Sequence, residues 1–146
     1  STAHHILGSN LNKAAIYKKT HENHPSTIWV RQSKEHYYWL WLHAKRMCEI
    51  YTSVTGRIHA SEAVLDATLD YPANISSAPF VEPPACVDDD LKHLARTHST
   101  EYAYQTYLNR KYNEWLTREK SMKVEFKVDI PDWWVDNTNI EQPKAA

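Results

Sequence analysis

The sequence predicts an all-α fold organised around one long helix. Over residues 34–55, apolar side chains recur at intervals of three and four residues, which is the spacing of one helix face. A tyrosine-rich stretch at about residues 100–117 shows the same spacing. Only residues 124–128 alternate as a short strand does, and no partner strand is visible. We therefore expect one helical domain over residues 1–146, with the long helix packed on the tyrosine-rich helix.

The N-terminal quarter is expected to contain short helical pieces and a polar loop. Residues 1–7 match the last turns of a helix that begins before this chain, and Gly8 suits the left-handed residue that ends a helix. Residues 9–25 are polar, which predicts a loop, and residues 27–33 are expected to form a short helix. The full protein is expected to carry a further strand and helix before residue 1.

Capping residues mark the remaining helices. Ser33 is a suitable N-cap for the long helix and Gly56 a suitable end, while Ser61 is placed to cap a second helix at about residues 62–69. Four prolines then predict an irregular connection over residues 71–87: Pro72, Pro79, Pro83 and Pro84.

Acidic and hydroxyl residues predict the last two helix starts. Asp88 to Asp90 precede a helix at about residues 91–98, where carboxylates favour the helix N-terminus. Ser99 or Thr100 is expected to cap the tyrosine-rich helix.

Composition excludes several classes of protein. Hydrophobic residues make up 42% and charged residues 24%, which is ordinary for a globular domain and argues against disorder. Two glycines are too few for a phosphate-binding glycine-rich loop, and no apolar run reaches the length of a membrane span. Two cysteines, Cys48 and Cys86, are too few for a disulfide framework, which favours a reducing compartment. We predict no cofactor.

Charge alternates in blocks along the chain. Residues 1–59 carry eight Lys or Arg against three acids, and residues 60–90 carry seven acids and no base. Residues 91–128 are again basic, and residues 129–146 are acidic. Such alternation gives either a mixed, solvated surface or two basic blocks that fold onto one anion-binding face. Both alternatives stay open at the level of sequence.

The densest polar cluster covers residues 18–25 and is followed by Trp29 and Arg31. It allows three interpretations: a metal site using His21 and His24, a structural loop, or an anion-binding surface. The metal interpretation lacks a third ligand at a recognisable spacing, so we assign no metal ligand. His21, His24 and Arg31 are the candidates for a catalytic role. The predicted nucleic-acid-binding residues are Lys18, Lys19, His21, His24, Arg31, Lys34, Arg57 and His59.

The aromatic residues fall into two groups. Those at helical spacing are expected in the core: Trp39, Trp41, Tyr104, Tyr107 and Trp115. Trp133 and Trp134 are adjacent, so they cannot both face one core from a helix, and at least one is expected at the surface. An exposed Trp can stack on a base or contact a partner protein.

Several ordered motifs resemble a small family of proteins from tailed phages, including those of cyanobacteria. The resemblance covers most of residues 20–134 and departs at Val54 and Gln105, where the family tends to have Arg. Its motifs are His21-Glu22-Asn23-His24-Pro25, Trp29-Val30-Arg31-Gln32-Ser33, Tyr38-Trp39-Leu40, Cys48-Glu49-x-Tyr51, Gly56-Arg57-x-His59, Ala103-Tyr104-x-x-Tyr107, Lys111-x-x-x-Trp115 and Pro131-Asp132-Trp133.

This family is distantly similar to the endonuclease V type of pyrimidine-dimer DNA glycosylase. In that type an N-terminal amine attacks the sugar carbon of a damaged nucleotide, and a helix carboxylate assists. The resemblance implies that both groups would precede residue 1.

The leading hypothesis is therefore a phage-encoded DNA-binding protein, whose enzymatic form would be a DNA glycosylase or lyase acting on damaged or modified bases. It would act in the host cytoplasm or the virion, with DNA as partner and no membrane. One alternative is a virion or assembly protein that binds phage proteins through Trp133, Trp134 and the proline-rich segment. The other is a small metal-binding protein that uses His21 and His24.

Overall fold

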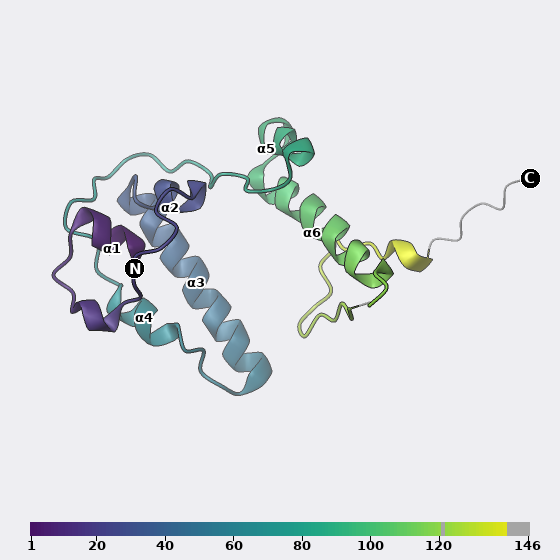
Figure 1. Ribbon diagram of the computed structural model, residues 1–146, viewed down its shortest axis with the longest axis horizontal. Coiled ribbons are helices and arrows are strands. Elements are labelled where there is room, and N and C mark those ends of the chain that lie inside the picture. Colours follow the sequence, from purple (N-terminus) through teal and green to yellow (C-terminus); the bar gives the residue numbers. More distant parts are fainter. Residues whose placement is uncertain (121, 140–146) are drawn as a thin grey trace, which may run out of the picture. The chain divides into compact units, whose positions relative to one another are not determined.

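A computed structural model describes residues 1–120 and 122–139 of the chain. Within these residues the secondary structure is helical and contains no strand, so the all-α prediction is confirmed (Figure 1). In chain order the elements are α1 (Thr2–Leu7), the 3₁₀ helix η1 (Lys13–Ala15), α2 (Pro25–Val30), α3 (Lys34–Thr55), α4 (Glu62–Ala67), η2 (Asp89–Leu91), α5 (Lys92–Thr97), α6 (Thr100–Thr117) and η3 (Asn137–Asn139).

The chain divides into two compact units, Ser1–Pro84 and Ala85–Ala146, here called unit 1 and unit 2. The long helix α3 belongs to unit 1 and the tyrosine-rich helix α6 to unit 2. The prediction of one domain over residues 1–146 stays a prediction.

Helix α3 has the bounds that its capping residues predicted. The Ser33 side chain accepts the backbone N–H of His36 and so satisfies one of the unpaired donors of the first turn. Gly56 has φ 68° and ψ 11°, the left-handed conformation that costs glycine least, and its N–H donates to the Thr52 carbonyl. Both helix ends are therefore fixed by local chemistry.

The core of unit 1 forms where α1, α2 and α3 meet the segment after α4. Its buried apolar residues are Ala3, Trp29, Val30, Tyr37 and Ile75. Gly8, which ends α1, has φ 82° and ψ 152°, so it has a positive φ but lies outside the left-handed helical region. Its carbonyl accepts the N–H of Ala73, which ties the end of α1 to the segment after α4.

Unit 2 packs α5 and η2 against α6. Its buried residues are Val87, Leu91 and Ala103. Ser99 caps α6 by accepting the N–H of Tyr102, which fits the predicted start of that helix. After α6 the chain turns back along the helix, where the Asn113 side chain donates to the Val135 carbonyl (2.8 Å) and accepts the N–H of Asn137 (2.8 Å).

Residues 124–128, which alternate in sequence as a short strand does, form no strand. Val124 and Phe126 are half-buried, whereas Glu125, Lys127 and Val128 are exposed. The alternation is real, but it reflects contact with α6, since the Phe126 ring lies 6.2 Å from that of Tyr112. No neighbouring strand accompanies it in the part of the chain that the structure describes.

The short helix expected at residues 27–33 is α2, which begins earlier and ends at Val30. Pro25 occupies its first turn, where a missing N–H costs nothing, and His24 caps it. The loop expected over residues 9–25 also contains η1. Helix α4 begins at Glu62 as predicted but ends at Ala67, and the Ser61 side chain makes no cap hydrogen bond.

Candidate functional site

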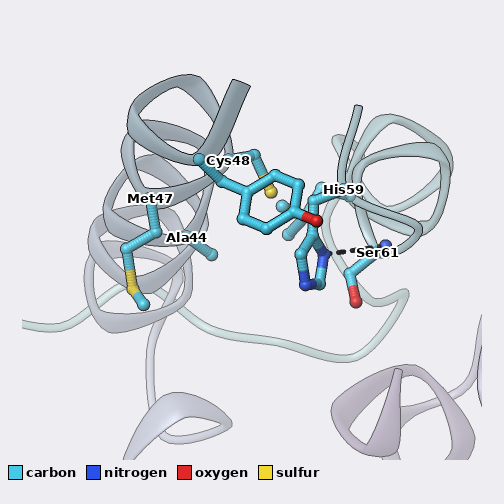
Figure 2. A pocket seen from close by; sticks show the side chains of 7 residues that line it. Ala44, Met47, Cys48, His59 and Ser61 are labelled. Carbon is cyan, nitrogen blue, oxygen red and sulfur yellow. Dashed lines mark hydrogen bonds between the residues drawn. The ribbon is translucent and has the colours of Figure 1, made fainter. Parts of the chain in front are cut away.

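A mostly apolar pocket of about 330 Å³ lies in unit 1, between the C-terminal half of α3 and the chain that enters α4. In Figure 2, Ala44 and Cys48 lie on the side of one helix that faces His59 and Ser61, and Met47 lies on the same helix farther from them. This volume is at the lower end of the range of ligand pockets, about 300–1,000 Å³. The lining residues are Ala44, Met47, Cys48, Tyr51, His59, Ser61 and Leu65.

Two aromatic rings form the polar end of this pocket. The rings of Tyr51 and His59 meet edge to face, with centroids 5.0 Å apart. The Nδ1 atom of His59 accepts the backbone N–H of Ser61 at 3.1 Å. Because Nδ1 is the acceptor, the neutral ring carries its proton on Nε2 and presents a donor there. The pocket therefore offers a planar wall and a hydrogen-bond donor of fixed orientation.

A second hollow of about 310 Å³ continues along the same helices. It lies between α3, α4 and the starts of α1 and α2, and shares Ala44 and Leu65 with the first pocket. Tyr37 and Trp41 line it from α3. The two hollows adjoin at these residues, and together they are here called the α3 groove, with Tyr37 toward one end and Tyr51 toward the other.

The basic segment reaches the rim of the pocket through Tyr17. The hydroxyl groups of Tyr17 and Ser61 are 3.1 Å apart, and η1 packs against α4. Lys18 and Lys19 follow directly in the chain and are exposed. The fold thus places the backbone just before this pair within one tyrosine side chain of Ser61, which lines the pocket, although some forty residues separate the pair from His59 in sequence.

Glu22 connects the lysine pair to Arg31. Lys19 forms an ion pair with the Glu22 carboxylate at 2.7 Å, and this hydrogen bond lowers the pKa of Glu22. The Arg31 guanidinium donates to the Glu22 backbone carbonyl at 2.6 Å. Arg57, one residue after α3, is exposed near His59 in sequence. We call Lys18, Lys19, Arg31, Arg57 and His59 the basic band.

The other predicted residues have local structural contacts. His24 caps α2 because its Nδ1 accepts the Ser26 N–H at 3.2 Å, and the His21 ring bonds the Thr20 hydroxyl. His21 also has a positive φ of 49°. Lys34 lies 5.7 Å from the centre of the Tyr71 ring.

The eight predicted residues do not form one tight cluster. Lys34 begins α3 and Arg57 follows its end, and 22 residues of α-helix span about 33 Å. The segment from Tyr17 to Arg31 links the two ends through the contacts at Ser61 and Glu22.

Sequence reasoning missed most of the pocket wall. Ala44, Met47, Cys48 and Tyr51 were identified as one face of the long helix, which predicts core. Cys48 is indeed buried, but Met47 is 61% exposed and Tyr51 38%. The spacing identifies the apolar face of the helix. Nothing in the local sequence shows how much of that face other segments of the chain cover.

Trp133 and Trp134, which were predicted to contact a partner protein, pack against α6 within unit 2. The Trp133 and Trp134 rings lie 6.4 and 5.9 Å from that of Tyr112, and Asn109 donates to the Trp133 carbonyl. Both side chains are half-buried. The hypothesis of a protein partner at these residues stays a hypothesis.

A polar hollow in unit 2 is organised by Arg110. Its guanidinium donates to Asp88 (2.5 Å) and Asp90 (2.7 Å), and it lowers the pKa of Asp90. The Asp88–Asp90 run therefore holds the start of η2 onto α6. Within residues 1–120 and 122–139, no group of three or more His, Cys, Asp or Glu side chains is arranged to hold a metal ion.

No helix in the described ranges is long and apolar enough to cross a membrane. Comparisons of the chain with protein-family models, curated proteins and solved structures give no match. The α3 groove and the basic band are therefore the features of unit 1 that indicate a function.

Proposed function

We propose that this chain binds DNA through unit 1, with the basic band on the phosphates and the Tyr51–His59 pocket receiving an unpaired base. The observation that carries the proposal is the contact of Tyr17 with Ser61, because it joins a basic segment to an aromatic-lined pocket. Nucleic-acid binding needs both features in one place.

Charge supports the phosphate contacts. Residues 9–34 carry five Lys or Arg and a single acid, Glu22, whose carboxylate is already paired with Lys19. Lys18, Lys19 and Arg57 are exposed and extend from the outer surface of unit 1. Phosphate contacts of this kind supply most of the affinity for nucleic acid without regard to sequence.

The pocket supports the base contact. A base stacks on an aromatic ring with a gain of about 1–3 kcal/mol, and the Tyr51 ring is partly exposed at the rim. The Nε2–H of His59 would donate to an acceptor on the base edge, since its Nδ1 is held by Ser61. Met47 and Cys48 provide apolar contacts along the wall.

The enzymatic form of this proposal is a glycosylase or lyase of the phage type, in the host cytoplasm or virion. It would position the sugar with His21, His24 or Arg31, and an N-terminal amine would supply the nucleophile, as in the enzymes that the sequence distantly resembles. Borohydride trapping of a covalent adduct on lesion-bearing DNA tests it.

Fluorescence anisotropy with a labelled single-stranded oligonucleotide, titrated over a range of salt, tests the DNA-binding proposal. On a single strand each lost phosphate contact reduces the slope of log affinity against log salt by about 0.7, so Lys18→Ala with Arg57→Ala should reduce it by about 1.4. Arg46→Ala is the matched control, because Arg46 is exposed on α3 and pairs with Glu49 outside the band. Absence of any binding would reject the proposal as a whole.

The pocket is tested separately by Tyr51→Ala. Loss of one stacking contact should weaken single-strand binding by about 5- to 100-fold with no change in the salt slope. Tyr38→Ala is the control, since Tyr38 is also exposed on α3 and stacks on Trp41 outside the pocket. Equal losses for both variants would place the base elsewhere on the helix.

A further inference from the structure

The segment after the core of unit 1 is held in an extended conformation along the start of α3 (Figure 1). The core ends at Ile75, which is 6% exposed. We call the next residues, 76–81, the strap. The Lys34 backbone N–H donates to the Ser76 carbonyl at 2.9 Å, and the Ala78 N–H donates to the Glu35 carboxylate at 2.9 Å. This hydrogen bond lowers the pKa of Glu35.

Two aromatic side chains bind both backbone groups of Val81. The Trp29 indole Nε1–H donates to the Val81 carbonyl at 2.9 Å, and the Val81 N–H donates to His36 Nε2 at 3.0 Å. His36 in turn donates from Nδ1 to the Trp29 carbonyl, which fixes its tautomer. The two rings are stacked with centroids 4.5 Å apart.

One side chain of the strap contacts the same rings. The Phe80 ring meets Trp29 and His36 edge to face, at 6.1 and 5.7 Å, and lies 6.1 Å from Trp39. Phe80 is nevertheless 46% exposed and Val81 62%. We call Trp29, Glu35, His36 and Trp39 the cradle.

We propose that the cradle is a peptide-binding site for an extended, proline-flanked Phe-Val segment, and that two copies of this chain can exchange their straps. The cradle recognises backbone groups and one aromatic side chain. Any chain that contains the same segment can therefore make the same contacts. Prolines 79, 83 and 84 limit the conformations of the free segment and reduce the entropy lost on binding.

The position of the strap makes a second copy the fitting occupant. Ile75 stays anchored in the core while residues 78–81, which make the cradle contacts, detach, because the strap contributes no buried residue to the core clusters. The boundary between the units follows three residues later, at Pro84. A strap can therefore leave its own cradle and enter that of another copy without unfolding unit 1, which is the usual geometry of domain swapping.

Energy transfer between two labelled populations of the full chain tests the exchange. We expect a transfer signal that grows with protein concentration and falls when an unlabelled peptide of residues 76–84 is added. The competing peptide with Phe80→Ala should reduce the signal at least tenfold less effectively, because it lacks the ring contacts with the cradle. The peptide with Val81→Ala is the matched control and should compete like the unchanged peptide, since only the Val81 backbone is bound.

Two results would overturn the proposal. A chain that shows no transfer up to millimolar concentration does not exchange its strap. A transfer signal that the unchanged peptide does not reduce, or that the Phe80→Ala peptide reduces equally well, would show association through another surface.

Discussion

Acid should destabilise unit 1 through the buried histidine His4. Its side chain is 2% exposed. The Tyr37 hydroxyl donates to the Thr68 carbonyl at 2.7 Å, so it must accept from His4 Nε2, which lies 2.7 Å away. In the neutral ring, Nδ1 of His4 then carries no proton and accepts from the Ser9 hydroxyl at 2.9 Å, so both ring nitrogens have a partner.

Burial lowers the pKa of His4 from 6.5 to about 4, with the neighbouring positive charges adding to the effect. The unfolded chain then binds a proton below pH 6.5 that the folded chain takes up only near pH 4. Stability is therefore complete above pH 6.5 and is lost as the pH falls toward 4. At about 1.4 kcal/mol per pKa unit, the loss is about 3 kcal/mol.

Urea unfolding at about pH 7.5 and about pH 4, followed by the amide signals of α3, measures this loss in unit 1. His4→Asn cannot titrate, so its stability should fall by about 3 kcal/mol less than that of the wild type. His5→Asn is the control, because His5 bonds the Tyr17 carbonyl at the surface. An equal fall in the wild type and His4→Asn would refute the reasoning.

Three further substitutions test how the helices are fixed. Ser33→Ala should cost about 1–2 kcal/mol in urea unfolding, because it removes the buried cap of α3. Gly56→Ala should cost about 1–2 kcal/mol through its positive φ alone, since an added Cβ meets no atom within 4 Å. Asn113→Ala should increase the exchange rate of the Asn137 amide hydrogen, which donates to the Asn113 side chain, without changing exchange in α3.

Local chemistry explains which parts of the fold could be predicted. Ser33, Gly56 and Ser99 fix helix ends by hydrogen bonds or backbone angles that span a few residues, and all three were identified from sequence. The alternation at residues 124–128, for which no partner strand was visible in the sequence, forms no strand, because a period of two reports alternating burial, which contact with α6 also produces. Sheet pairing needs a second strand, and none is present in the described residues.

The candidate site was predictable only in part for a related reason. Lys18 and His59 were both named as nucleic-acid-binding residues, but nothing in the sequence joins them. Their proximity depends on one contact between Tyr17 and Ser61, two ordinary polar residues 44 positions apart. Likewise, the spacing of Met47 and Tyr51 indicates an apolar face without indicating that α4 covers only part of it.

The base-binding pocket and the strap exchange depend on different sides of α3 and can fail independently. Tyr37, Ala44 and Tyr51 are seven residues apart, close to two helical turns, so they line one side, which is the α3 groove. His36 precedes Tyr37 and so projects about 100° around the helix, toward the strap. Phe80→Ala should therefore leave DNA affinity unchanged, and Tyr51→Ala should leave strap exchange unchanged. A loss of both functions in either variant would indicate a general loosening of α3 and would remove the support for separate sites.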